Sequence, residues 1–227
     1  MTLFDVPVLW VPYWYYPLNT EYGLRVLPGY TSKWGGYLLT GYVYDIWNEG
    51  KGEGPSLGGS TYADFRTRNG VALGQTIRWN LADYGKGKFK VYHAWDLDED
   101  RYDDRWSDHK HNYRNWGSTV DRERYRVYLE HSADFTERDA LRLQVQYLSD
   151  SHVLYDFFRR RHEHVSYPMN ELWYDHREIS WALGGSVGGP VNRFYGGTQR
   201  LPEGWLAIEP QPIFSLPVNY ESQTRAG

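Results

Sequence analysis

An acidic segment in the middle of the chain has the spacing closest to that of a metal site. Asp96, Asp98 and Asp100 repeat at intervals of two residues, as the first three ligands of a calcium-binding EF-hand loop do. That loop also needs a glycine at its sixth position and a glutamate at its twelfth. Arg101 and Ser107 stand at those positions. We therefore predict a solvated surface loop and no calcium site.

Histidines also occur in pairs that could bind a transition metal. The two His-x-His pairs are His109 with His111 and His162 with His164. Such a pair binds a metal ion when both rings project from the same face of a strand. Both pairs fall in predicted loops without an acidic residue at a suitable spacing, so we predict exposed loop histidines. We expect no metal and no cofactor.

A run of three arginines, Arg159, Arg160 and Arg161, is the tightest basic cluster in the chain. A guanidinium group binds phosphate oxygens through two parallel hydrogen bonds, so this run is a candidate contact for anionic lipids or sugar phosphates. The alternative is a charged loop that faces solvent. The net charge of the chain is −4, which gives no support for nucleic-acid binding.

No pattern of catalytic residues is found. The chain contains no G-x-S-x-G elbow, no H-E-x-x-H motif and no glycine-rich phosphate-binding loop. Because it has no cysteine, thiolate metal sites and cysteine nucleophiles are excluded. Carboxylates are abundant, but no signature selects a pair for glycoside hydrolysis. We expect a protein that is not an enzyme.

The elements that would position these residues are strands. Between Val71 and Leu81 large apolar residues occupy mostly the odd positions, and small or polar residues occupy the even ones. The same alternation recurs in 87–97, 121–132 and 138–149. A period of two predicts strands with one apolar and one polar face. The apolar face could cover the core of a soluble protein or meet lipid in a transmembrane barrel.

Strand length favours the barrel. The alternating runs, at 36–46, 70–81, 87–97, 121–132 and 138–149, are each 11 or 12 residues long. A tilted transmembrane strand needs roughly 9–11 residues, whereas strands of globular proteins most often have about 5–6.

The predicted connections give a second indication. If Tyr22–Thr31 is the first strand and direction alternates, the two longest connections, 97–120 and 149–170, lie at the same end of the sheet. Outer-membrane barrels have this arrangement, with long extracellular loops and short periplasmic turns. The glycine-rich connection 47–60 is predicted to be a long insertion at the opposite end and is the exception.

The composition agrees with strands that meet an interface. Aromatic residues make up 18% of the chain, with 21 Tyr and 11 Trp. Transmembrane barrels place such residues in girdles at both membrane interfaces, because each has an apolar body and a polar tip. The mean hydropathy is −0.72, which in a barrel reflects the averaging of alternating faces.

Several short motifs resemble one known family. The segment 7–17 reads PVLWVPYWYYP, and Tyr22–Ser32 follows it with Arg25, Pro28 and a Tyr-Thr-Ser ending. Further matches are the Ser149-Asp150 pair, the element Tyr155-Asp156-Phe157, and the proline-bearing stretch 201–217. In this order they resemble the lipopolysaccharide-assembly outer-membrane proteins (the LptD or organic-solvent-tolerance family). The glycine-rich connection and the acidic loop depart from the family and suggest a divergent lineage.

The resemblance implies an all-β fold in two parts. Residues 1–18 would be the end of a periplasmic β-jellyroll and its junction, and residues 19–227 the first strands of an antiparallel transmembrane β-barrel. The later strands and most of the jellyroll would be missing from a fragment of this kind. The start of the chain lacks a basic region followed by an apolar one, so we expect a signal peptide upstream.

The function implied by the resemblance is transport of lipopolysaccharide (LPS) into the outer leaflet of the outer membrane. Pro17 and Pro28 are candidates for a lateral gate, because a strand residue without an N–H donor pairs less well. The alternative is that each proline ends a strand or lies in a turn. Trp10, Tyr13 and Trp14 are candidate LPS contacts together with the three arginines.

The implied partners are LPS, outer-membrane lipids, a lipoprotein that plugs the lumen, and the periplasmic proteins that bridge LPS to the barrel. Two other functions stay open at this point. One is a generic outer-membrane porin or channel. The other is a secreted carbohydrate-binding β-sandwich whose aromatic residues stack on sugars.

Overall fold

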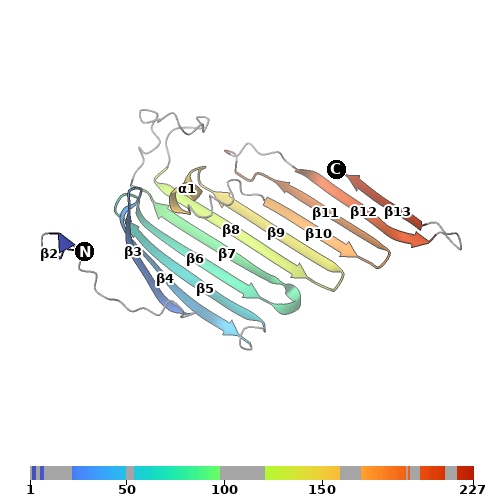
Figure 1. The fold of residues 1–227 in the computed structure, drawn as a ribbon, viewed down its shortest axis with the longest axis horizontal. Coiled ribbons are helices and arrows are strands. Elements are labelled where there is room, and N and C mark those ends of the chain that lie inside the picture. The colour runs from blue at the N-terminus through green and yellow to red at the C-terminus, as the bar shows by residue number, and fades with distance from the viewer. Residues whose placement is uncertain are drawn as a thin grey trace.

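A computed structural model describes residues 22–49, 54–97, 121–158, 170–192, 194, 200–212 and 219–227, with the backbone of residues 2–3 and 6–7. Eleven strands form one antiparallel sheet in which every strand pairs with its neighbours in the sequence (Figure 1). They are β3 (Gly23–Thr31), β4 (Gly35–Asn48), β5 (Ser56–Arg66), β6 (Gly70–Asn80), β7 (Lys86–Trp95), β8 (Glu123–Asp134), β9 (Asp139–Leu148), β10 (Asn170–Arg177), β11 (Trp181–Gly189), β12 (Arg200–Pro212) and β13 (Asn219–Ala226).

The predicted all-β antiparallel class is therefore confirmed, and each predicted strand overlaps an observed one. Among the described residues the sheet is open, with β3 at one edge and β13 at the other. The two-residue strands β1 (Thr2–Leu3) and β2 (Val6–Pro7) pair only with each other. The rest of the expected jellyroll segment 1–18 lies outside the described residues.

The connections divide the sheet into two ends. At one, which we call the loop end, they span residues 32–34, 67–69, 96–122, 149–169 and 190–199. At the other, the turn end, they span residues 49–55, 81–85, 135–138, 178–180 and 213–218. The two longest connections share the loop end, as predicted. At the turn end a short 3-10 helix, η1 (Ala82–Tyr84), joins β6 to β7.

The predicted long insertion at 47–60 was wrong. β4 continues to Asn48 and β5 begins at Ser56, so only 49–55 connects them. Gly58 and Gly59 lie within β5 because the strand there passes close to its neighbour. A Cβ on Gly59 would lie 2.8 Å from the Tyr44 hydroxyl, and one on Gly58 would lie 2.8 Å from Asp45 Oδ1.

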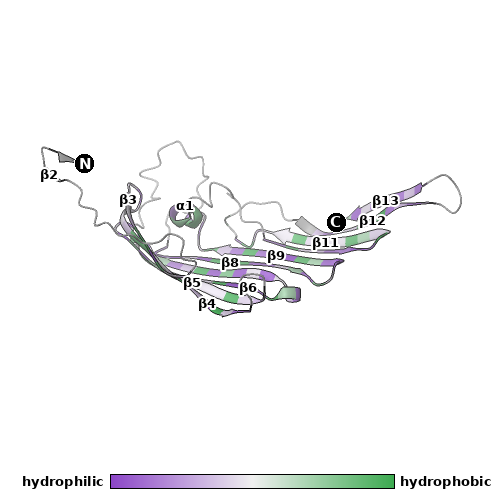
Figure 2. Cartoon of the chain, turned by 60° about the horizontal axis from the view of Figure 1, so that its bottom comes forward, coloured by the Kyte–Doolittle hydropathy of each residue, from purple (hydrophilic) through white to green (hydrophobic). Residues whose placement is uncertain are grey.

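Strand register divides the sheet into two faces. Residues directly opposite each other in an antiparallel pair project from the same face. One face carries the short helix α1 (Val153–Phe157), which Figure 2 shows in the hollow of the curved sheet; we call it the inner face and the opposite one the outer face. The alternating bands along the strands in Figure 2 follow from the period of two.

The outer face is largely apolar across the whole sheet. Register aligns one aliphatic or aromatic residue of nearly every strand on this face: Val26, Leu38, Phe65, Leu73, Val91, Val127, Val145, Leu172, Val187 and Leu206. Many are open to the surroundings, with exposed fractions of 53% for Leu73, 41% for Leu172 and 44% for Leu206. This is a continuous apolar surface that nothing in the described chain covers.

Aromatic residues border this apolar surface at both ends. Near the loop end Tyr125 and Tyr147 stack with ring centroids 5.9 Å apart, next to Trp95 in the adjoining strand. Near the turn end Trp79 stacks on His131 at 6.0 Å, and Tyr42 on Tyr44 at 6.2 Å. Along β6 the level of Trp95, which pairs with Val71, is eight residues from Trp79, or roughly 27 Å at about 3.4 Å per residue. Along β8 only six residues, or roughly 20 Å, separate Tyr125 from His131.

The outer face also carries a small polar group. Thr61 donates a hydrogen bond of 2.6 Å to the Gln75 side chain, and Gln75 donates to the Tyr44 hydroxyl. These groups satisfy one another and lie next to the aromatic border at the turn end. Among the described residues, no helix is long and apolar enough to cross a bilayer.

Candidate functional site

The inner face carries most of the charged strand residues. Its basic residues include Arg66, Arg78, Lys88, Lys90, Arg124, Arg126 and Arg142, and its acidic ones Asp64, Glu130, Glu171 and Asp175. Some pair across or along strands: Lys88 Nζ lies 2.6 Å from Glu130 Oε1, and Arg66 Nη2 lies 3.2 Å from Asp64 Oδ2. The inner face is therefore a polar, predominantly basic surface.

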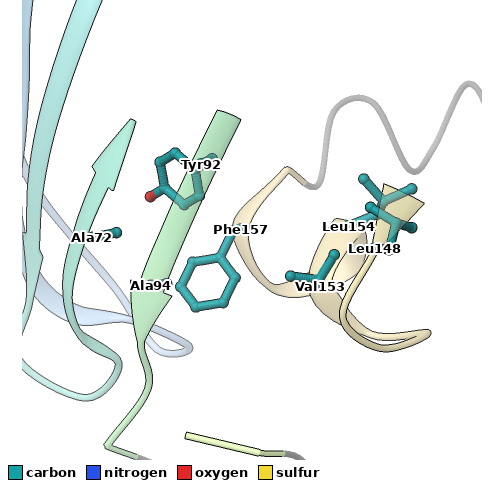
Figure 3. Packing of buried hydrophobic residues seen from close by; sticks show 7 residues of the cluster. All are labelled: Ala72, Tyr92, Ala94, Leu148, Val153, Leu154 and Phe157. Carbon is teal, nitrogen blue, oxygen red and sulfur yellow. The ribbon is translucent and has the colours of Figure 1, made fainter. Parts of the chain in front are cut away.

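At the loop end α1 folds onto this surface (Figure 3). Phe157 packs against Tyr92 with ring centroids 6.1 Å apart, in a buried cluster that also includes Ala72, Ala94, Leu148, Val153 and Leu154. The two alanines of β6 and β7 are fully buried beneath the helix. Because their side chains are small, the sheet has room for a helix on its concave side.

Arg124 anchors the helix through charge. Its guanidinium group is 1% exposed and contacts three carboxylates that come from different elements. Nη1 lies 2.8 Å from Asp96 Oδ2 and 2.6 Å from Asp156 Oδ2, while Nε and Nη2 bind both oxygens of Asp150 at 3.0 and 2.8 Å. Asp96 follows β7, Asp150 follows β9 and Asp156 lies in α1. We call these four residues the arginine cluster.

At the turn end the inner face is hollowed instead of covered. A hollow of about 840 Å³ is lined by residues that include Arg78, Lys88, Glu130, Arg142, Glu171 and Trp173. The Arg142 guanidinium carbon lies 5.5 Å from the centre of the Trp173 ring. Basic groups bind phosphate and other anionic oxygens, so the excess of basic side chains in this hollow suits an anionic group.

Pro28 lies inside β3, opposite Leu38, and not at a strand end or in a turn. The Thr67 N–H donates to the Gly36 carbonyl, so Gly36 and, by alternation, Leu38 direct their backbone groups towards β5. Pro28 therefore belongs to a non-hydrogen-bonded pair with β4, and its nitrogen faces the free edge of the sheet. The residue removes a donor from that edge without costing a bond to β4.

Most of the other predicted site residues lie outside the described residues: Trp10, Tyr13, Trp14, Pro17, Arg159, Arg160, Arg161, and the histidines at 109, 111, 162 and 164. Asp98 and Asp100 lie outside them too. Asp96 is described, and its predicted exposure was wrong: it is 2% exposed and paired with Arg124. The structure holds no group of three potential metal ligands within its described part.

The arginine cluster is the feature that sequence reasoning missed. Ser149-Asp150 and Tyr155-Asp156-Phe157 attracted notice only through the family resemblance, which gave neither carboxylate a role. No local pattern joins them to Arg124, which is 26 and 32 residues away along the chain. The one available signal was an arginine on the polar face of a predicted strand.

The comparisons with known proteins add no further assignment. No protein-family model matches this chain, and no curated protein matches it. The family resemblance therefore rests on the short motifs, and the function has to be argued from the geometry.

Replacing Arg124 by methionine should cost about 3–5 kcal/mol of folding free energy, because it leaves buried carboxylates without their cation. The measurement is urea unfolding of the protein. Arg138→Met is the matched control, since Arg138 is 54% exposed and pairs with Glu178 at the turn end. An exposed pair contributes about 0–1 kcal/mol. Equal losses for the two variants would contradict the anchoring role of Arg124.

His152, just before α1, should make this segment sensitive to acid. Burial is the main cause that lowers the pKa of His152, and the nearby Asp156 and Asp150 oppose it. The folded state therefore favours the neutral ring, and its stability is lost as pH falls below the ordinary histidine pKa of about 6.5. Hydrogen exchange of residues 149–158, corrected for its intrinsic pH dependence, should rise on acidification. His152→Gln should abolish this rise; an unchanged rise would assign it to another group.

Proposed function

We propose that this chain forms one wall of an outer-membrane β-barrel that conducts LPS from the periplasm to the outer leaflet. The observation that carries the proposal is the division of an eleven-stranded sheet into an apolar outer face and a charged inner face. A barrel wall needs this division, because one face meets lipid and the other a wet lumen.

In a soluble protein the two faces of the same sheet would have the opposite environments. Such a protein would cover the apolar face with a second layer and leave the charged face in water. Here Leu73 and Leu172 are open on the outer face, while Arg124 and Arg126 are buried on the inner one. The secreted carbohydrate-binding β-sandwich is therefore the weaker candidate. A sandwich needs a second sheet packed on the apolar face, and the eleven strands described form a single layer.

The aromatic borders support a bilayer as the covering medium. Their separation of roughly 20–27 Å along the strand becomes about 16–21 Å along the membrane normal at a strand tilt of about 40°, somewhat less than the ~25 Å apolar band of such barrels. Short turns mark the periplasmic side, so the turn end would face the periplasm and the loop end the exterior.

In this orientation the basic hollow with Trp173 lies at the periplasmic entrance. The phosphorylated saccharide of LPS would enter there, with the candidate contacts Trp10, Tyr13 and Trp14 preceding it along the path. The lipid chains need an apolar exit, and the free edge of β3 offers one. Pro28 weakens pairing at that edge, and with Pro17 it would form one side of a lateral gate.

A generic porin would share the two faces and the orientation, but it has no need of an edge that opens. Pro28 at the free edge favours the conduit. The lumen-plugging lipoprotein and the periplasmic bridge proteins belong to the proposal through the family resemblance. The same holds for LPS contacts at Arg159, Arg160 and Arg161.

Two neighbouring substitutions test whether the outer face meets lipid. Val145→Arg places a charge at the middle of the outer face and should cost about 2–4 kcal/mol in a bilayer. Gln144→Arg places the same charge on the inner face and should change stability by no more than about 0.5 kcal/mol. Unfolding of the whole protein from lipid vesicles measures both. Equal costs would argue against a lipid-facing outer surface.

Photocrosslinking in living cells tests the conduit itself. A benzoylphenylalanine in place of Trp173 should capture LPS on the inner face, and capture should stop when the supply of new LPS is blocked. The same group in place of the adjacent Leu172 faces bulk lipid outside the lumen and should give no LPS crosslink that depends on the supply of new LPS. If position 173 captures no LPS while the protein still conducts ions, the porin is the better assignment.

A further inference from the structure

The turn between β3 and β4 contacts α1 although 122 residues separate them along the chain. Lys33 Nζ lies 2.8 Å from Asp156 Oδ1, and it donates a hydrogen bond of 3.0 Å to the Tyr155 carbonyl. The same ammonium group lies 3.4 Å from the centre of the Tyr155 ring. One lysine thus contacts a carboxylate, a carbonyl and an aromatic face of the same helix.

Trp34 adds a second attachment from the same turn. Its indole N–H donates a hydrogen bond of 2.7 Å to the Asp156 carbonyl. The ring packs edge-on against Tyr37 of β4, with centroids 5.3 Å apart, and lies 4.7 Å from the Arg66 guanidinium carbon. The attachment therefore continues into the body of the first hairpin, β3–β4.

Asp156 joins this hairpin to the arginine cluster. Its side chain is fully buried, with Oδ1 facing Lys33 and Oδ2 facing Arg124 at 2.6 Å. One carboxylate thus bridges a cation of the edge hairpin and a cation of β8. Phe157 packs on Tyr92 between them. In Figure 2 the sheet curls up around α1 on the β3 side and lies flatter towards β13.

We propose that α1 is a strap that restrains the first hairpin, with the Lys33–Asp156 ion pair as its clasp. If the hairpin swings away from the inner face, the buried Asp156 carboxylate keeps Arg124 but loses Lys33. The hydrogen bonds from Lys33 and Trp34 to the helix carbonyls are lost with it. The strap therefore favours the curved position of β3. Displacing α1 from the inner face releases the same contacts and frees the hairpin.

This coupling acts in both directions, because any two linked equilibria affect each other equally. Its functional meaning rests on the proposed lateral exit at β3. A bulky saccharide that enters the lumen competes with α1 for the inner face, and so loosens the edge through which the lipid chains would leave. The strap thereby links an occupied lumen to an opened gate.

Hydrogen exchange of the protein in detergent tests the strap without any LPS. Lys33→Met should raise amide exchange at least several-fold in the β3–β4 hairpin, and also in α1, since the two restrain each other. Lys33→Arg keeps the charge and should stay near wild type. Trp34→Phe removes the indole donor and part of the ring but keeps Lys33, and should give a smaller rise.

Arg138→Met is the control for loss of a cation at the opposite end and should leave both segments unchanged. Exchange in Lys33→Met equal to wild type would overturn the strap, and so would a rise spread over all strands. A rise confined to the hairpin and α1 supports it. Because Trp173 crosslinking reports on LPS separately, failure of the conduit and failure of the strap are distinguishable.

Discussion

Strand register is the constraint on which the rest of this structure depends. Ten successive antiparallel pairings join β3 to β13, and each assigns alternate residues to one face. A slip of one residue in β7 would move Lys88 and Lys90 to the apolar outer face and bring Phe89 and Val91 to the charged inner one. Because such a slip exchanges the residues of the two faces, the contrast between the largely apolar outer face and the charged inner face opposes it. The apolar outer surface, the basic hollow and the surface on which α1 packs all follow from the strand register.

The sheet was largely predictable because its signal is local. Alternation with a period of two survives in each strand, and strand direction then determines which connections share an end. The glycines of β5 were assigned to a long connection because glycine occurs both in turns and where two backbones approach closely. At Gly58 and Gly59 it admits close approach of Asp45 and Tyr44, whereas the sequence suggested a turn. The neighbour that explains these glycines lies in another strand and is not visible to a local pattern.

The inner-face site was not predictable for the same reason. Arg124 meets carboxylates 26, 28 and 32 residues away, brought together by a connection that folds inward. Asp96 begins an acidic run that resembles a solvated loop, yet this one carboxylate is buried by its pairing with Arg124. A polar network of this kind forms only where the sheet curves and its alanines leave space. Neither condition can be recognised from a short segment of the sequence. Both the free energy that such a network costs and the free energy that it contributes depend on tertiary contacts.

Pro28 has a further consequence at the free edge of the sheet. An unpaired edge strand presents a row of backbone groups to which any extended chain can add, and this is a common route to aggregation. Because the nitrogen of Pro28 faces that row, it interrupts the row near the middle of β3. While this edge is unpaired, the sheet is therefore a poorer template for a foreign strand. The residue that would weaken the seam of the proposed barrel wall also protects the open sheet from aggregation.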